Sequence, residues 1–111
     1  MSATSNRHGA PIQPDITTTG TPGALDQVRT FRDAALRPLY VRPCVVTNLH
    51  ATEDLFVLIN EENASDVNYL RKVPAGEAID FSFTGRLNVN FVSLYYVAAA
   101  YSNAQVRGWT P

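Results

Sequence analysis

Apolar and polar positions alternate along most of the chain beyond its first third, and turn-forming residues separate the alternating runs. In residues 77–84, for example, Ile79, Phe81 and Phe83 alternate with polar neighbours, as in a strand that buries one face. Runs of this kind, or short continuously apolar ones, predict about seven strands, at residues 39–49, 54–60, 67–73, 77–84, 86–92, 94–102 and 104–109. We therefore expect a mainly β domain over residues 38–111, built as a small antiparallel β-sandwich or barrel.

Three features of these runs predict how the strands are arranged. Gly85 is a tight link between the runs 77–84 and 86–92, so these two are expected to pair as a hairpin. Pro43 cannot donate a hydrogen bond to a neighbouring strand, which predicts that its run lies at a sheet edge or contains a bulge. The run 94–102 is apolar on both faces, which favours close packing against another element.

The N-terminal residues 1–22 lack the side chains of a core segment. The stretch GAPIQPDITTTGTPGA, at residues 9–24, is rich in proline, glycine and threonine, and its only large apolar residues are Ile12 and Ile16. Such a composition buries too little apolar surface to offset the entropy that is lost when the segment becomes ordered. We therefore predict an extended arm over residues 1–22 that other contacts must hold in place.

Between the arm and the β-domain, apolar residues recur at helical spacing. Leu25, Val28 and Phe31 lie three residues apart, and Pro22 suits the first position of a helix. This spacing predicts a short helical linker over residues 23–37.

Length, composition and charge exclude several classes of protein. The chain has 111 residues, of which 45% are hydrophobic and 17% charged, and these values fit one globular domain. The formal net charge of −1 gives no global field to attract nucleic acid or an anionic membrane, so neither is expected as a partner. The longest apolar run, LYYVAAAY, is far shorter than the ~20 residues of a membrane-spanning helix. The N-terminus lacks the features of a signal peptide, which predicts synthesis in the cytoplasm.

Residues with catalytic or metal-binding chemistry are few and scattered. His8, His50 and the single cysteine, Cys44, do not have the spacing of a zinc site, so neither a metal nor a cofactor is expected. The acidic stretch NEENASD, at residues 60–66, lacks the ligand pattern of a calcium loop and is expected to be a solvated turn. His50 and Cys44 could serve an enzyme only if the fold placed both in one pocket. Because no nucleophile motif or phosphate-binding loop accompanies them, we expect no catalytic residues and a protein that is not an enzyme.

The basic and aromatic residues suggest contact with other proteins. All but one of the nine basic residues are arginine, a residue that is enriched at protein interfaces. Arg29 and Arg32 follow the arm, and the front of the chain is mildly basic whereas the rear is mildly acidic. Tyr95, Tyr101 and Trp109, near the C-terminus, are candidates for an oligomer interface. A β-domain of this size gains stability by packing against a copy of itself or against a larger partner, and a homo-oligomer is expected.

The arm and the β-domain together resemble a known layout. VPAGEAIDFSF at residues 73–83, the alternating strands that follow, and the ending YSNAQVRGWTP are similar to small structural proteins of tailed bacteriophages, above all capsid decoration (cement) proteins. The resemblance implies a virion protein, made in the host cytoplasm, that binds the capsid surface, often as a trimer, and staples subunits of the major capsid protein. It also implies that the arm contributes, by strand addition or by lying in a groove. The candidate partner-binding residues are Pro11, Ile12, Pro14, Ile16, Arg29 and Arg32.

A carbohydrate-binding or adhesive β-sandwich of a phage tail or fibre is the alternative. It requires Tyr95, Tyr101 or Trp109 to be exposed in a row, as a platform for a sugar ring. The structural hypothesis instead places these rings in the core or in a subunit interface. The burial of the three rings therefore distinguishes the two hypotheses.

Overall fold

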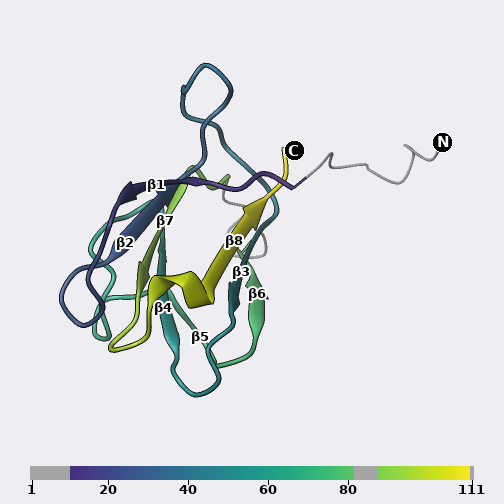
Figure 1. Cartoon of the computed structure of the whole chain (residues 1–111). Helices are drawn as coiled ribbons and strands as arrows, with labels where there is room; N and C mark the ends of the chain where they lie inside the picture. The colour runs from purple at the N-terminus through teal and green to yellow at the C-terminus, as the bar shows by residue number, and fades with distance from the viewer. Residues whose placement is uncertain (1–10, 82–87, 111) are drawn as a thin grey trace.

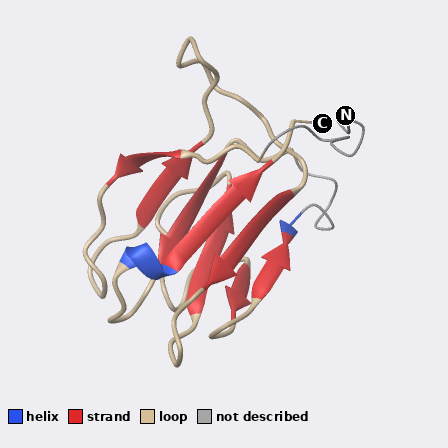
Figure 2. Ribbon diagram, turned by 45° about the vertical axis from the view of Figure 1, so that its right-hand side comes forward, coloured by secondary structure: helices blue, strands red, loops and turns tan. Residues whose placement is uncertain are grey.

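The computed structural model describes residues 11–81 and 88–110 and is mainly β (Figure 1). Two antiparallel sheets contain all the named strands of these residues. The larger sheet has the order β1 (Asp15–Thr18), β2 (Gln27–Thr30), β7 (Phe91–Tyr95), β4 (Leu55–Ile59) and β5 (Arg71–Val73). The smaller sheet has the order β6 (Ala78–Asp80), β3 (Cys44–Asn48) and β8 (Ala104–Gly108). A short 3-10 helix, η3 (Tyr101–Asn103), leads into β8, and strands and loops make up nearly all the rest (Figure 2). The prediction of a mainly β chain is confirmed.

The inner faces of the two sheets enclose one hydrophobic core. In the larger sheet, the fully buried Leu94 and Val57 lie opposite each other in the register of β7 and β4. In the smaller sheet, Val46 and Val106 are a register pair and are also buried. Each such side chain contributes about 1.5–3 kcal/mol when it is removed from water. The strict alternation of buried and half-buried positions in β3 follows from this arrangement.

The structure has a strand where the sequence predicts a short helix, so this prediction is wrong. Gly23 has a φ of 84°, which ends any helical path, and Leu25 is 61% exposed. The following residues form β2, which pairs with β7 on one side and β1 on the other. Val28 and Thr30 are β-branched and favour a strand when such partners exist. Pairing across the sheet therefore overrides the helical spacing.

The predicted hairpin is also not formed by the described strands. Strand β6 pairs with β3, whereas β7 pairs with β2 and β4, so the strands before and after Gly85 belong to different sheets. Gly85 itself lies outside the described residues. The predicted strand 94–102 is divided, because β7 ends at Tyr95 and the chain passes through η3 before β8.

Pro43 does not mark an edge strand. Strand β3 begins at the next residue, Cys44, and is the central strand of the smaller sheet. The proline therefore precedes the ladder, where its missing N–H costs no strand hydrogen bond.

The described part of the predicted arm lies on its own domain. Ile12 and Gly108 exchange two backbone hydrogen bonds, of 2.7 and 2.9 Å, at the end of β8. A few residues later the chain forms β1 along β2 (Figure 1). The segment thus passes from the smaller sheet to the larger one. Within the described residues, no helix is long and apolar enough to cross a membrane.

Candidate functional site: the groove between β1 and β8

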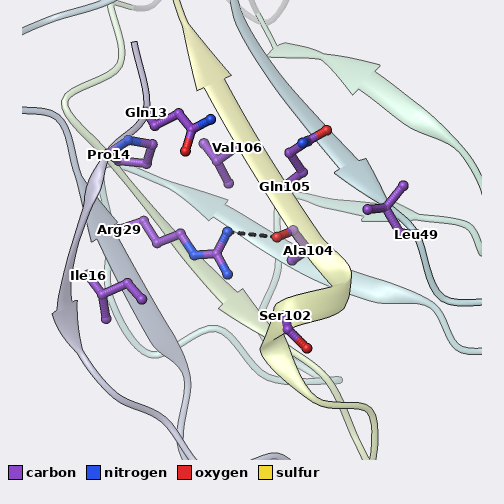
Figure 3. A pocket seen from close by; sticks show the side chains of 9 residues that line it. All are labelled: Gln13, Pro14, Ile16, Arg29, Leu49, Ser102, Ala104, Gln105 and Val106. Carbon is purple, nitrogen blue, oxygen red and sulfur yellow. Dashed lines mark hydrogen bonds between the residues drawn. The ribbon is translucent and has the colours of Figure 1, made fainter.

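A groove of about 320 Å³ lies where the arm crosses between the sheets (Figure 3). We call it the arm groove. It is lined by Gln13, Pro14, Ile16, Arg29, Leu49, Ser102, Ala104, Gln105 and Val106. These residues come from the arm and β1, from β2, from the residue that follows β3, and from η3 and β8. Figure 3 shows the Arg29 side chain reaching across the groove toward β8.

Arg29 is the only charged residue of this lining, and it points between the sheets. Its register partner in β7 is Val92, which is fully buried on the inner face. The guanidinium donates from Nη1 to the Ala104 carbonyl and from Nη2 to the Tyr101 carbonyl, each at 2.8 Å. Its Nε donates to Gln27 Oε1, also at 2.8 Å. Arg29 therefore ties β2 of the larger sheet to η3 and β8 through neutral acceptors.

The charge of Arg29 has no acidic counterpart in the part of the chain that the structure describes. The ion pairs found there join Arg37 to Asp33 and Lys72 to Asp54. Burial lowers the pKa of Arg29, and a smaller effect of Tyr96 opposes this shift. A half-buried cation that is bonded only to neutral groups creates a positive potential in the groove, which favours a negatively charged group there.

Strand β8 presents backbone groups to the same groove. Leu49 donates to the Asn103 carbonyl and Trp109 donates to the Pro43 carbonyl, so odd-numbered residues of this segment bond toward β3. The even-numbered Ala104 and Gly108 direct their bonds the other way, to Arg29 and Ile12. Val106 lies between them and follows the same alternation, so its N–H and C=O point into the groove.

His50 and Cys44 do not form a catalytic pair. They flank opposite ends of β3, and the Cys44 thiol is fully buried. Burial, with a smaller effect of Asp80, raises the pKa of that thiol to about 12, which keeps it protonated and unreactive. His50 Nδ1 accepts hydrogen bonds from the backbone of Thr52 and Glu53, at 3.1 and 2.9 Å. His50 therefore organises the loop after β3.

Asn48 is an organising residue that the sequence analysis missed. Its side chain is fully buried and donates to the carbonyls of Glu53 and Val73, at 2.7 and 3.0 Å. Its Oδ1 accepts from the His50 backbone and from the Tyr96 hydroxyl. The sequence did contain a signal for this role, namely an asparagine at the end of the strand run CVVTN. A buried amide side chain is normally found where the fold supplies partners for its hydrogen bonds.

The three aromatic candidates do not form an exposed row. Tyr95 is 9% exposed and packs with Leu58 and Ala64 on the outer side of the larger sheet. Tyr101 is 6% exposed, lies in the main core and donates its hydroxyl to the Leu25 carbonyl at 2.8 Å. Trp109 is half-buried, next to β8.

The predicted arm contacts differ in exposure. Pro11 and Ile16 are exposed, whereas Ile12 and Pro14 are half-buried, and Ile12 packs against the core. Arg32 is half-buried and donates to the Leu36 carbonyl at 3.3 Å. The structure thus brings Ile16, Pro14 and Arg29 together in the arm groove and leaves Arg32 outside that lining.

The acidic stretch at residues 60–66 folds over the outer side of the larger sheet. Asp26 accepts hydrogen bonds from the Asn63 backbone and the Ser93 hydroxyl, while the same hydroxyl accepts from the Ala64 backbone. Glu61 and Glu62 remain exposed. Among the described residues, no three His, Cys, Asp or Glu side chains are placed to hold a metal ion.

Comparison of the chain with protein-family models, with curated proteins and with solved structures found no match.

Proposed function

We propose that this protein is a non-enzymatic virion structural protein, a small β-sandwich that binds the outer surface of a phage capsid and stabilises contacts between subunits of the major capsid protein. The observation that carries the proposal is the contrast between the two edges of the larger sheet. Strand β5, at one edge, carries exposed Arg71 and Lys72, and such charges discourage pairing with another chain. Strand β1, at the other edge, has one exposed charge, Asp15, at its start and otherwise exposes Ile16 and two threonines. The arm side is thus suited to contact with another protein.

The arm takes part in this contact through its exposed residues. Pro11 and Ile16 offer apolar surface to a capsid subunit, while Ile12 keeps the segment attached to its own domain. Each contact is small, but many copies on a capsid lattice add their effects through multivalency. We expect a homo-oligomer, with a trimer as the first expectation, which sedimentation velocity measures directly.

Two observations favour binding over catalysis and over sugar recognition. The Cys44 thiol is buried and protonated, and His50 Nδ1 is occupied by loop amides, so neither group is poised to react. Less than a tenth of the surface of Tyr95 and Tyr101 is exposed, so these rings do not offer the platform that a carbohydrate-binding domain needs.

The experiment that tests the proposal is co-sedimentation with capsids of the virus that encodes the chain, prepared without this protein. We expect the protein to pellet with the capsids in many copies and to raise the temperature at which the capsids open. Ile16→Asp should lower occupancy about tenfold, whereas Val67→Asp, which changes an 88% exposed residue outside the arm groove, should bind as the wild type does. Protein that stays in the supernatant, or that binds without stabilising the capsid, would contradict the proposal.

A further inference from the structure

We propose that the arm groove binds an extended acidic segment of the partner protein, whose backbone pairs with Val106 and whose carboxylate contacts Arg29. This proposal rests on the proposed function only in taking the partner to be a capsid subunit. It adds where the contact is made, the conformation of the bound segment and the sign of its charge.

The backbone of β8 supplies the first part of the site. The N–H and C=O of Val106 point into the groove and have no hydrogen-bonding partner among the described residues. Val106 is only 3% exposed, so these groups are also largely withdrawn from water. A backbone pair that is neither bonded nor well hydrated is costly, and an added strand would satisfy both groups. The Ile12–Gly108 pair, two residues further along β8, already shows this mode of pairing within the chain.

Arg29 supplies the second part. Three of its five N–H groups are used by the carbonyls of Ala104 and Tyr101 and by Gln27, which leaves two for a ligand. These bonds hold the guanidinium in one position, so little side-chain entropy remains to be lost on binding. A carboxylate would give the half-buried cation the counter-charge that the described residues do not supply.

The remaining lining suits a peptide. Pro14, Ile16 and Leu49 provide apolar contacts, and both Ile16 and Leu49 are more than half exposed. Gln13 and Gln105 also line the groove, and Figure 3 shows the Gln13 side chain directed toward Val106, so it must turn aside to admit a strand and can then bond to its backbone. Ile12 already pairs with the backbone of Gly108, so a bound segment can pair with only a short part of β8. Each site is therefore expected to bind weakly.

The test uses the full-length protein and two probe peptides, acetyl-Thr-Val-Asp-Val-Thr-amide and its Asn analogue, in an NMR titration of backbone amides. We expect the Asp peptide to shift the Val106 amide and the Arg29 side-chain signals and to bind at least fivefold more tightly than the Asn peptide. Equal affinity for the two peptides, or shifts confined to residues outside the groove, would overturn the proposal.

Variants test the role of the cation. Arg29→Gln should abolish the preference for the Asp peptide, while Arg107→Gln, which removes an exposed cation on β8 that does not line the groove, should retain it. Arg29→Lys should keep part of the preference for the Asp peptide. Its backbone amide spectrum is first compared with that of the wild type to establish that the fold is unchanged. If the peptide titration fails while the protein still pellets with capsids, this groove is not the contact site and the proposed function stands.

Discussion

Asn48 shows how one buried polar residue connects distant parts of the chain. It lies at the end of β3, and its four hydrogen bonds reach the following loop, the β5 backbone and the Tyr96 hydroxyl. Every polar atom of its side chain is therefore satisfied in the interior. Removing such a residue leaves its partners buried without bonds, which costs more than the bonds themselves contribute.

Replacing Asn48 with alanine is expected to lower the free energy of unfolding by about 3 kcal/mol, because four partners lose their bonds and two of these bonds, with Val73 and Tyr96, are buried. Urea denaturation followed by tryptophan fluorescence measures this change. Asn68→Ala is the matched control, since Asn68 is exposed and its side chain donates one 3.0 Å hydrogen bond, to the Asn63 carbonyl. A loss from Asn48→Ala no larger than that from the control would contradict the role assigned to Asn48.

Tyr96 makes the stability depend on alkaline pH. Burial raises the pKa of its hydroxyl to about 12, whereas a tyrosine in an unfolded chain ionises near its ordinary value of about 10. Between these values the unfolded state releases a proton that the folded state keeps, so the free energy of unfolding falls as the pH rises. Tyr96 therefore lowers the free energy of unfolding only above about pH 10. The Cys44 thiol, whose pKa is also raised to about 12, acts in the same direction from about pH 9.

Urea denaturation at pH 8 and at pH 11 measures this dependence. Tyr96→Phe should be less stable than the wild type at pH 8, because it loses the hydrogen bond to Asn48, yet it should lose less further stability by pH 11. Parallel declines in the two proteins would show that Tyr96 does not carry the effect.

At the scale of elements, β1 and the residues before it close the side of the domain between β2 and β8. The four residues of β1 are all exposed, so burial does not hold them. Backbone pairing with β2 and the hydroxyls of Thr17 and Thr18, which bond to the Val28 backbone at 3.1 and 2.9 Å, do so instead. The half-buried Ile12 adds the apolar contact with the core.

A matched pair of substitutions tests this attachment. Ile12→Asp should lower the free energy of unfolding by about 2 kcal/mol, because it places a charge against the core at the Gly108 pairing site. Ile16→Asp should change it by less than about 0.5 kcal/mol, since that side chain is 55% exposed. Thermal and urea unfolding of the two variants give the comparison. Equal, small effects would mean that Ile12 does not dock on the domain.

Some of these elements could be predicted from the sequence and others could not. The apolar run of β4 and the alternation in β8 were sufficient to locate both strands, because burial alone fixes those patterns. The helical spacing before β3 was misleading, because the partners that make β2 a strand lie in β7, more than sixty residues further on. Likewise, residue type marked Arg29 as a contact residue, but its bonds to carbonyls 72 and 75 residues away depend on the tertiary fold.

At the scale of the whole molecule, a polar side chain bridges the two sheets near each side of the domain. Asn48, from the smaller sheet, bonds to the Val73 carbonyl of β5, and Arg29, from the larger sheet, bonds to the Ala104 carbonyl of β8. The first bridge is buried, whereas the second lies beside the arm groove. The space between the sheets is thus filled around Asn48, whereas the arm groove lies open beside Arg29.

The described part of the arm lies on its own domain and forms one wall of the arm groove. Amide hydrogen exchange of the isolated protein, read residue by residue by NMR, measures this attachment. The Ile12 amide, bonded at 2.7 Å to the Gly108 carbonyl, should exchange about a hundredfold or more slowly than in an unfolded chain, and more slowly than the Gln13 amide, which has no acceptor among the described residues. Exchange of Ile12 at the unfolded rate, while the β3 amides stay protected, would contradict the account.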